Sequence, residues 1–234
     1  MPSLAATLLF AMAPGLPAPA GVDPPSSSAR DQRYRELVRA EFVATIAPAI
    51  ESIATIEPAL RAAQEARRNW LPYSTEWQRW TAADARYHEP GYAWAEFAWT
   101  IARDRAFRES HTELDVARDV QRALMAPGSG GLVRRAALVD SNGGLAAGVN
   151  WTDDWFQGDE SPFREVDGRR SVFIDRPVRD HSDATPQVTI AIPIWDQTEP
   201  PLRSDAVLDG TGSESGGGAF LGALILVVTP REPG

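Results

Sequence analysis

The sequence predicts an α+β protein in which a long N-terminal helix and a helical region pack on a five-stranded antiparallel sheet. Apolar residues recur at helical intervals through residues 31–126, and short runs rich in β-branched residues follow through residues 132–229. Between the first two of those runs, the turn sequence Asp140-Ser-Asn-Gly-Gly144 is typical of a β-hairpin. Helices that precede a sheet in this way can cover it.

The first helical segment extends from Asp31 to Arg68. Pro48 and Pro58 lie within it, and each removes a backbone donor and clashes with the preceding turn. We therefore expect the segment to kink or to break into two or three helices. Its apolar residues form an amphipathic stripe that consists of Leu37, Phe42, Ile46, Ile50, Ile53, Ile56 and Leu60.

Further helices are expected before residue 127. Thr75-Glu-Trp-Gln78 and Thr112-Glu-Leu-Asp115 have the spacing of capping signals, so each predicts a helix that begins at its threonine. Another helix is expected after Pro90-Gly91. The chain then changes to the two-residue period of strands, and the five expected strands comprise residues 132–139, 145–150, 171–175, 187–194 and 219–229.

Composition limits the function classes. The net charge is −9 and the isoelectric point is about 4.9, which argues against a nucleic-acid partner because phosphates would be repelled. Cysteine is absent, so the chain has no disulfide, thiolate metal site or cysteine nucleophile. No segment of the sequence is long and apolar enough to span a bilayer.

The N-terminus resembles a secretory leader. Residues 1–20 contain a short apolar run that ends in Ala18-Pro19-Ala20, which is typical of a cleavage site, although no basic residue precedes the run. This pattern predicts a periplasmic or secreted protein. Residues 21–30 are expected to be a linker and residues 230–234 a tail, with no output module following on the chain.

No catalytic or metal-binding signature is found in the sequence. The motifs Gly-x-Ser-x-Gly, Gly-Lys-Ser and His-Glu-x-x-His are absent, so no enzymatic activity, cofactor or metal is expected. His88, His111 and His181 stand far apart and are expected on the surface or in loops. A weaker alternative is a hydrolase that uses paired carboxylates.

A crossover with aromatic and acidic residues follows the second strand, and it predicts a binding site. Indole faces beside carboxylates suit an amine or a stacked ring, and an arginine could hold a carboxylate. Whether the rings line a pocket or plug the sheet is left open by the sequence. The predicted ligand-binding residues are Trp151, Asp154, Trp155, Phe156, Gln157, Asp175, Arg176 and Asp180.

Several ordered motifs resemble the Cache domain, the PDC-type, PAS-like sensor fold. They are the turn Asp140-x-x-Gly143, the tract from Thr152 to Glu160, the run from Val172 to Asp180, and the last two strands. The resemblance covers residues 110–229 and implies a single Cache-like domain over residues 31–229, with a helical part at 31–126 and a sheet part at 132–229. The N-terminal helix fits the family only in outline.

The resemblance implies a non-catalytic, extracytoplasmic sensor or accessory domain. Its partners would be a small metabolite (an amine, an amino-acid-like molecule or a carboxylate) and a membrane-bound signalling protein. The amino-acid motif of the family is incomplete here, because Glu160-Ser-Pro-Phe163 lacks its arginine and Val178-Arg-Asp180 keeps only the aspartate. A protein–protein interaction module with a tryptophan-rich surface is the alternative, since the chain has eight tryptophans.

Overall fold

The computed structural model describes residues 27–68, 90–125, 132–150, 154–179, 186–196 and 218–229. Helices form most of the described residues before residue 126, as expected, and three wider π-helical turns (η) lie among them. The helical elements are α1 (Ser27–Glu41), η1 (Phe42–Ile46), α2 (Ala47–Glu51), α3 (Ile56–Arg68), α5 (Pro90–Glu96), η2 (Phe97–Ile101), α6 (Arg105–Thr112), α7 (Asp115–Val120), η3 (Gln121–Met125) and α8 (Ser161–Val166).

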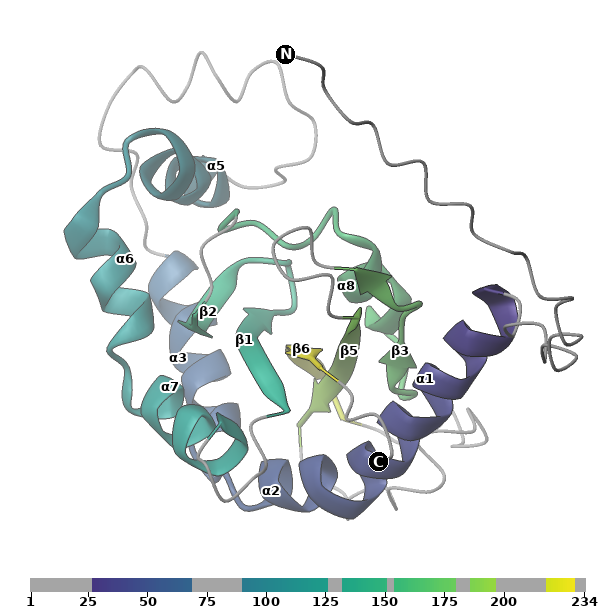
Figure 1. Ribbon diagram of the computed structural model, residues 1–234. Helices are drawn as coiled ribbons and strands as arrows, with labels where there is room; N and C mark the ends of the chain where they lie inside the picture. The colour runs from purple at the N-terminus through teal and green to yellow at the C-terminus, as the bar shows by residue number, and fades with distance from the viewer. Residues whose placement is uncertain are drawn as a thin grey trace, which may run out of the picture.

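The strands form one antiparallel sheet in the order β2-β1-β6-β5-β3, which confirms the predicted fold class. A further short strand, β4, pairs with β5 outside that order and was not predicted. Figure 1 shows the sheet at the centre of the molecule, with helices around it. The strand bounds are β1 (Val133–Asp140), β2 (Leu145–Val149), β3 (Phe173–Ile174), β4 (Val178–Arg179), β5 (Pro186–Trp195) and β6 (Phe220–Val228).

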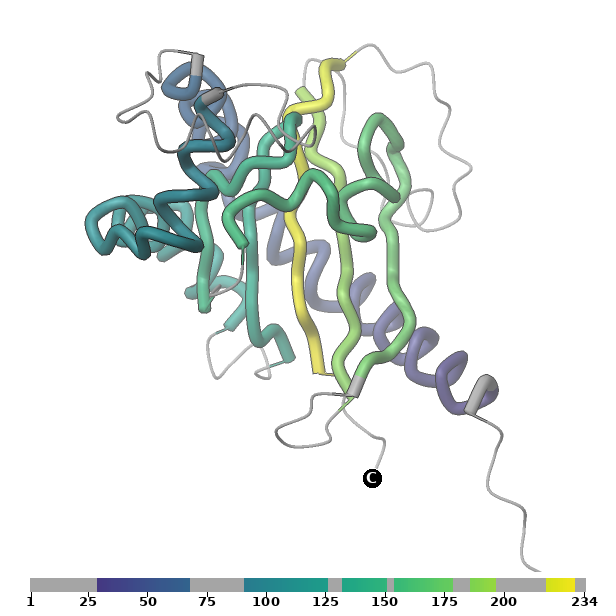
Figure 2. Tube along the Cα trace, turned by 90° about the horizontal axis from the view of Figure 1, so that it is seen from above, coloured from purple at the N-terminus to yellow at the C-terminus, as the bar shows by residue number. Residues whose placement is uncertain are grey.

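The last strand, β6, lies in the middle of the sheet between β1 and β5 (Figure 2). In the register, Leu224 stands beside Leu138 of β1 on one side and Ile192 of β5 on the other. Alternate residues of a strand point to opposite faces, so these three side chains share one face. The sequence of β6 is almost continuously apolar because both of its faces are buried.

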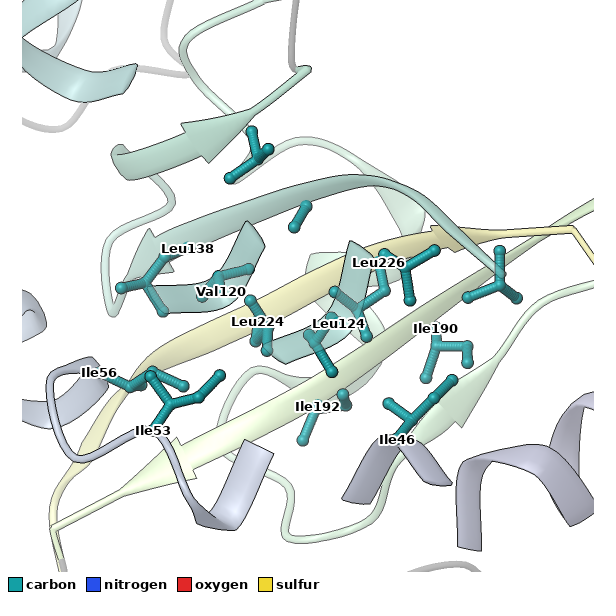
Figure 3. Close-up of a cluster of buried hydrophobic side chains, with 14 of the residues drawn as sticks. Ile46, Ile53, Ile56, Val120, Leu124, Leu138, Ile190, Ile192, Leu224 and Leu226 are labelled. Atoms are coloured by element: carbon teal, nitrogen blue, oxygen red, sulfur yellow. The ribbon is translucent and has the colours of Figure 1, made fainter. Parts of the chain in front are cut away.

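One face of the sheet packs against α1, η1, α2, α3, α7 and η3. We call its buried side chains the first core cluster; Figure 3 shows isoleucines of the N-terminal segment packed near the apolar side chains of β1, β5 and β6. Members include Phe42, Ile46, Ile53, Ile56, Leu60, Val120, Leu124, Leu138, Val188, Ile190, Ile192, Leu224 and Leu226.

The opposite face packs against α5, η2, α8 and the crossover between β2 and α8. We call its buried side chains the second core cluster, and aromatic rings make up much of it. Edge-to-face pairs join several rings; for example, the centroids of Tyr92 and Trp155 lie 5.4 Å apart. The buried members are Tyr92, Ala95, Trp99, Ala137, Val139, Leu145, Trp155, Phe156, Phe163, Val166, Ala191, Ala223 and Ile225.

The two prolines of the first helical segment act differently. Pro48 follows the π-helical turn η1, where the backbone N–H of Ala47 donates to Phe42 rather than to the residue four positions earlier. This widening accommodates a residue that cannot donate to the preceding turn. Pro58 lies in the first turn of α3, where no intrahelical donor is needed. The predicted break is confirmed at residues 52–55, between the two prolines.

The structure differs from the predicted elements in a few places. Thr112 ends α6 instead of beginning a helix, and α7 begins after Leu114 without a side-chain cap. Helix α6 was not predicted; Asp104 caps it by accepting a hydrogen bond from the backbone N–H of Phe107 at 3.1 Å. Helix α1 begins at Ser27, inside the predicted linker, and α8 lies within the predicted sheet part. The leader, the tail and the helix expected at residue 75 lie outside the described residues.

Candidate functional site

A groove lies between α3 on one side and the end of α6 and the start of α7 on the other. Its volume is about 500 Å³, within the range of about 300–1,000 Å³ that is usual for small-molecule sites. The edge strand β2 contributes Ala146 to it. The lining residues are Thr55, Pro58, Ala59, Ala62, Ala63, Ala66, Arg67, Ser110, His111, Leu114, Asp115, Val116 and Ala146.

Two adjacent faces of α3 have different roles. Ile56 and Leu60 are buried in the first core cluster and attach the helix to the sheet. The neighbouring face carries only small side chains at Ala59, Ala62 and Ala66, which leave room beside the helix. Alanine has the highest helix propensity, so α3 keeps its helical geometry without large side chains on this face.

Arg67 is the last residue of α3 that lines the groove, and it is only 4% exposed. Its guanidinium forms a buried ion pair with Asp140 and donates hydrogen bonds to the backbone oxygens of Gly144, at 3.2 Å, and Leu145. The same guanidinium lies 4.7 Å from the ring centroid of Trp155. Burial lowers the pKa of Arg67 to about 10, which leaves it protonated at neutral pH.

Asp140 connects Arg67 to the hairpin and to α5. Its side chain is fully buried, and one carboxylate oxygen accepts the backbone N–H groups of Asn142, at 2.9 Å, and Gly144, at 3.0 Å. The other oxygen accepts the hydroxyl of Tyr92 at 2.8 Å. Asp140 is therefore both the first residue of the turn and the counterion of Arg67, which belongs to α3.

His111, in the last turn of α6, links the groove to the crossover. Its Nε2 accepts the indole N–H of Trp155 at 3.3 Å, so the ring proton lies on Nδ1, which is 2.8 Å from the backbone oxygen of Phe107. Burial lowers the pKa of His111 to about 4, with smaller effects from the Phe107 carbonyl and from the charge of Arg67. The expectation that His111 lies on the surface or in a loop is wrong: the residue is helical and buried, and it is neutral at pH 7.

The crossover is held by backbone contacts to the last residues of the hairpin turn. Gly144 and Phe156 form an antiparallel bridge, and the N–H of Gln157 donates to Gly143 at 2.7 Å. The N–H of Phe156 donates to the buried carboxylate of Glu96 at 2.7 Å. Burial raises the pKa of Glu96, while hydrogen bonds from Thr100 and Phe156 act in the opposite direction.

The predicted binding residues of the crossover fall into two groups. Trp155 is fully buried, and Phe156 and Gln157 are nearly so, at 7% and 4% exposure. Asp154 is exposed. The ring of Trp155 therefore packs in the second core cluster, and a role for these side chains in ligand binding stays a prediction.

The other predicted residues lie elsewhere or outside the described part of the chain. Asp175 and Arg176 follow β3, at the opposite edge of the sheet from β2, where the crossover attaches. The Asp175 carboxylate accepts the backbone N–H of Arg176 at 2.6 Å. Trp151 and Asp180 lie outside the described residues.

Sequence reasoning missed Arg67, Asp140, His111 and Glu96. A signal existed for Arg67, because it follows Ile56 and Leu60 at helical spacing on the buried face of α3. A charged residue on such a face requires a buried partner. Neither Asp140, which was interpreted as a turn residue, nor His111 carried a comparable signal.

The described residues form neither a metal site nor a helix that could cross a membrane. No group of three or more histidine, aspartate or glutamate side chains there is placed to hold a metal ion. No helix in the same part of the chain has the length and apolar character needed to cross a membrane. The described tryptophans, Trp94, Trp99, Trp155 and Trp195, are buried or half-buried.

Comparison with known proteins gives little further information. No family model and no curated protein matches the chain. A solved structure described as the ligand binding domain of Mlp24 with asparagine is similar, at 14% sequence identity and a TM-score of 0.28. The match covers 84% of this chain but 60% of the other, so this chain spans less than two thirds of its length. A TM-score this low carries no argument, and the resemblance to the Cache family stays a prediction.

Proposed function

We propose that this chain is a non-catalytic domain that binds a small molecule in the groove between α3 and α6–α7. The observation that carries the proposal is the groove itself: about 500 Å³ of space beside small side chains, with Arg67 and His111 among its lining residues. The ion pair of Arg67 and the hydrogen bonds of His111 hold these two side chains in place. A site with fixed walls binds a ligand without first having to order them.

We further propose that the domain is an extracytoplasmic sensor or an accessory to one. Support for this part comes from the ordered strand and turn motifs that resemble the Cache family and from the leader-like residues 1–20. A small metabolite would be the ligand and a membrane-bound signalling protein the partner. Both the crossover and Arg67 bond to Gly144 of the hairpin. Arg67 and His111 line the groove and contact Trp155, so a ligand there would touch side chains that contact the crossover.

A ligand screen by thermal unfolding tests the proposal. Amino acids, amines, short carboxylates and neutral aromatic compounds are added at millimolar concentration to the purified protein. A ligand present at about 100 times its dissociation constant should raise the free energy of unfolding by about 2.7 kcal/mol. The same ligand should lose its effect on the variant Ala62→Leu/Ala66→Leu, which fills the groove from exposed positions of α3.

The matched control is Ala40→Leu, an exposed alanine-to-leucine change on α1, outside the groove. It should leave the ligand effect unchanged. The proposal is wrong if no compound stabilises the protein, or if the stabilisation survives in Ala62→Leu/Ala66→Leu.

A further inference from the structure

The charges around the groove are already paired, and this limits what the groove can bind. We propose that its occupant is a neutral, mainly apolar molecule, and not the amine, amino acid or carboxylate that the sequence predicts. This inference rests on the proposed function, because it specifies the ligand of the same groove.

The walls are largely hydrocarbon. The face of α3 presents Pro58 and four alanines, and the opposite wall presents Leu114 and Val116. Leu114 is 40% exposed although it is a large apolar side chain, so the groove contains apolar surface that a ligand could cover. Covering such surface with an apolar ligand is favourable.

Arg67, the cation among the lining residues, already has partners. Arg67 pairs with Asp140 and donates to two backbone oxygens, and the rings of Tyr92 and Trp155 lie within 5.4 Å of its guanidinium carbon. A ligand carboxylate would have to take Arg67 from Asp140, whose carboxylate would then remain buried beside the competing one. Such an exchange replaces one ion pair by another and leaves an additional buried negative charge.

The neighbouring polar groups provide no replacement charge. His111 is neutral, and both of its nitrogens have partners. The hydroxyl of Ser110 donates to the backbone oxygen of Phe107 at 2.7 Å. These groups leave at most a lone pair that could accept a hydrogen bond from a ligand.

An amine would also lack a buried counterion among the lining residues. Asp115 is the one carboxylate among those lining residues, and it pairs with Arg118 at the rim, where the Asp115 side chain is 84% exposed. Thr55 donates its hydroxyl to Asp119 at 2.9 Å. An ammonium group in the groove would lose water without gaining a buried partner, which is unfavourable.

Three compounds with the same ring and different charge test the inference: 3-methylindole, indole-3-acetate and tryptamine. Binding is measured by titration calorimetry and by amide and indole N–H shifts in two-dimensional NMR. We expect 3-methylindole to bind, with the two charged compounds at least about ten-fold weaker. The indole N–H signal of Trp155, assigned by its loss in Trp155→Phe, should shift because its acceptor His111 lines the groove.

The groove-filling variant locates the binding. Ala62→Leu should weaken the affinity for 3-methylindole, and Ala40→Leu should leave it unchanged, because both positions are exposed on helices and only Ala62 lines the groove. Equal affinity in Ala62→Leu and Ala40→Leu would place the ligand elsewhere and overturn the inference.

Other outcomes separate the inference from the proposed function. Binding of indole-3-acetate or tryptamine in the groove as tightly as 3-methylindole would overturn the inference and leave the proposed function in place. If none of the three binds but the wider screen gives a charged ligand sensitive to Ala62→Leu/Ala66→Leu, the inference again fails alone; a neutral aromatic ligand sensitive to the same variant would support it. If the screen is also empty, both fail; a dimer broken by Ala62→Leu would then identify the groove as an interface between copies.

Discussion

The two faces of the sheet are stabilised in different ways. The first core cluster joins apolar side chains of the strands to those that helices present at regular spacing. The second contains aromatic rings, and a buried ion pair and several directed hydrogen bonds adjoin it. Apolar packing tolerates substitutions of similar size, whereas a buried polar group requires its own partner. The second face therefore fixes the position of the hairpin, α5 and α6 more specifically than the first fixes its helices.

The largest effect is expected for Asp140→Ala. It leaves the charge of Arg67 buried without a carboxylate, so the free energy of unfolding should fall by about 3–5 kcal/mol. Urea denaturation monitored by circular dichroism measures it. Arg169→Ala is the control, because its 2.8 Å pair with Glu165 is on the surface and contributes at most about 1 kcal/mol. Equal losses in the two variants would show that the buried pair is not a special feature of the second face.

Leu224→Ala tests the first face. Leu224 is fully buried, and its truncation should cost about 2–5 kcal/mol through lost burial and a residual cavity. The same urea experiment measures this cost. Leu224→Met, which nearly conserves volume, should cost less than about 1.5 kcal/mol. A large loss in Leu224→Met would contradict the view that the first face tolerates conservative substitutions.

Gly144→Ala tests the close packing around the hairpin. A Cβ at this position would lie 2.6 Å from Cε1 of Tyr92, 2.8 Å from Nη1 of Arg67 and closer still to the indole of Trp155. We expect a loss of about 1–3 kcal/mol. In a Trp155→Phe background the smaller ring makes room, so the added cost of Gly144→Ala should decrease. An unchanged cost of Gly144→Ala in that background would show that the indole of Trp155 is not what excludes a Cβ at this position.

The smallest effect is a pH dependence that belongs to the second face. The native pKa of His111 is about 4 against a usual value of 6.5, so below pH 6.5 the unfolded chain binds a proton that the native protein does not. Stability should therefore fall as the pH falls from 6.5 towards 4, by up to about 2 kcal/mol between pH 7 and 5. His111→Gln keeps an acceptor for Trp155 but does not titrate, so its stability should change less over this range. If the free energy of unfolding changed with pH in the same way in His111→Gln and in the unaltered protein, His111 would not be the source of the pH dependence.

Much of the fold could be predicted because it depends on local pattern. The continuous apolar run of β6 and the alternation of Val188, Ile190 and Ile192 in β5 indicate strands without reference to any partner. The turn at Asp140 is likewise a property of a few adjacent residues. Strand β4 was missed because Val178 and Arg179 form no apolar run of the kind that predicted the equally short β3.

The candidate site was harder to predict because its contacts join residues that are distant in the sequence. No local pattern relates Arg67 to Asp140 or His111 to Trp155, although each pair is in contact. Trp155 stands in a loop-like, acidic tract, so its complete burial follows only from how the crossover bridges to Gly144. The spacing of apolar residues does not predict the groove either, because the main feature of the groove is that one face of α3 carries only small side chains.

The central place of β6 has a consequence for the order of folding. Strands β1 and β5 do not pair with each other; each pairs with β6, which is synthesised after both. Until β6 has left the ribosome, β1 and β5 each lack the strand with which one of their edges pairs. The sheet must then close through contacts of long sequence separation, a topology that slows folding and prolongs exposure to aggregation.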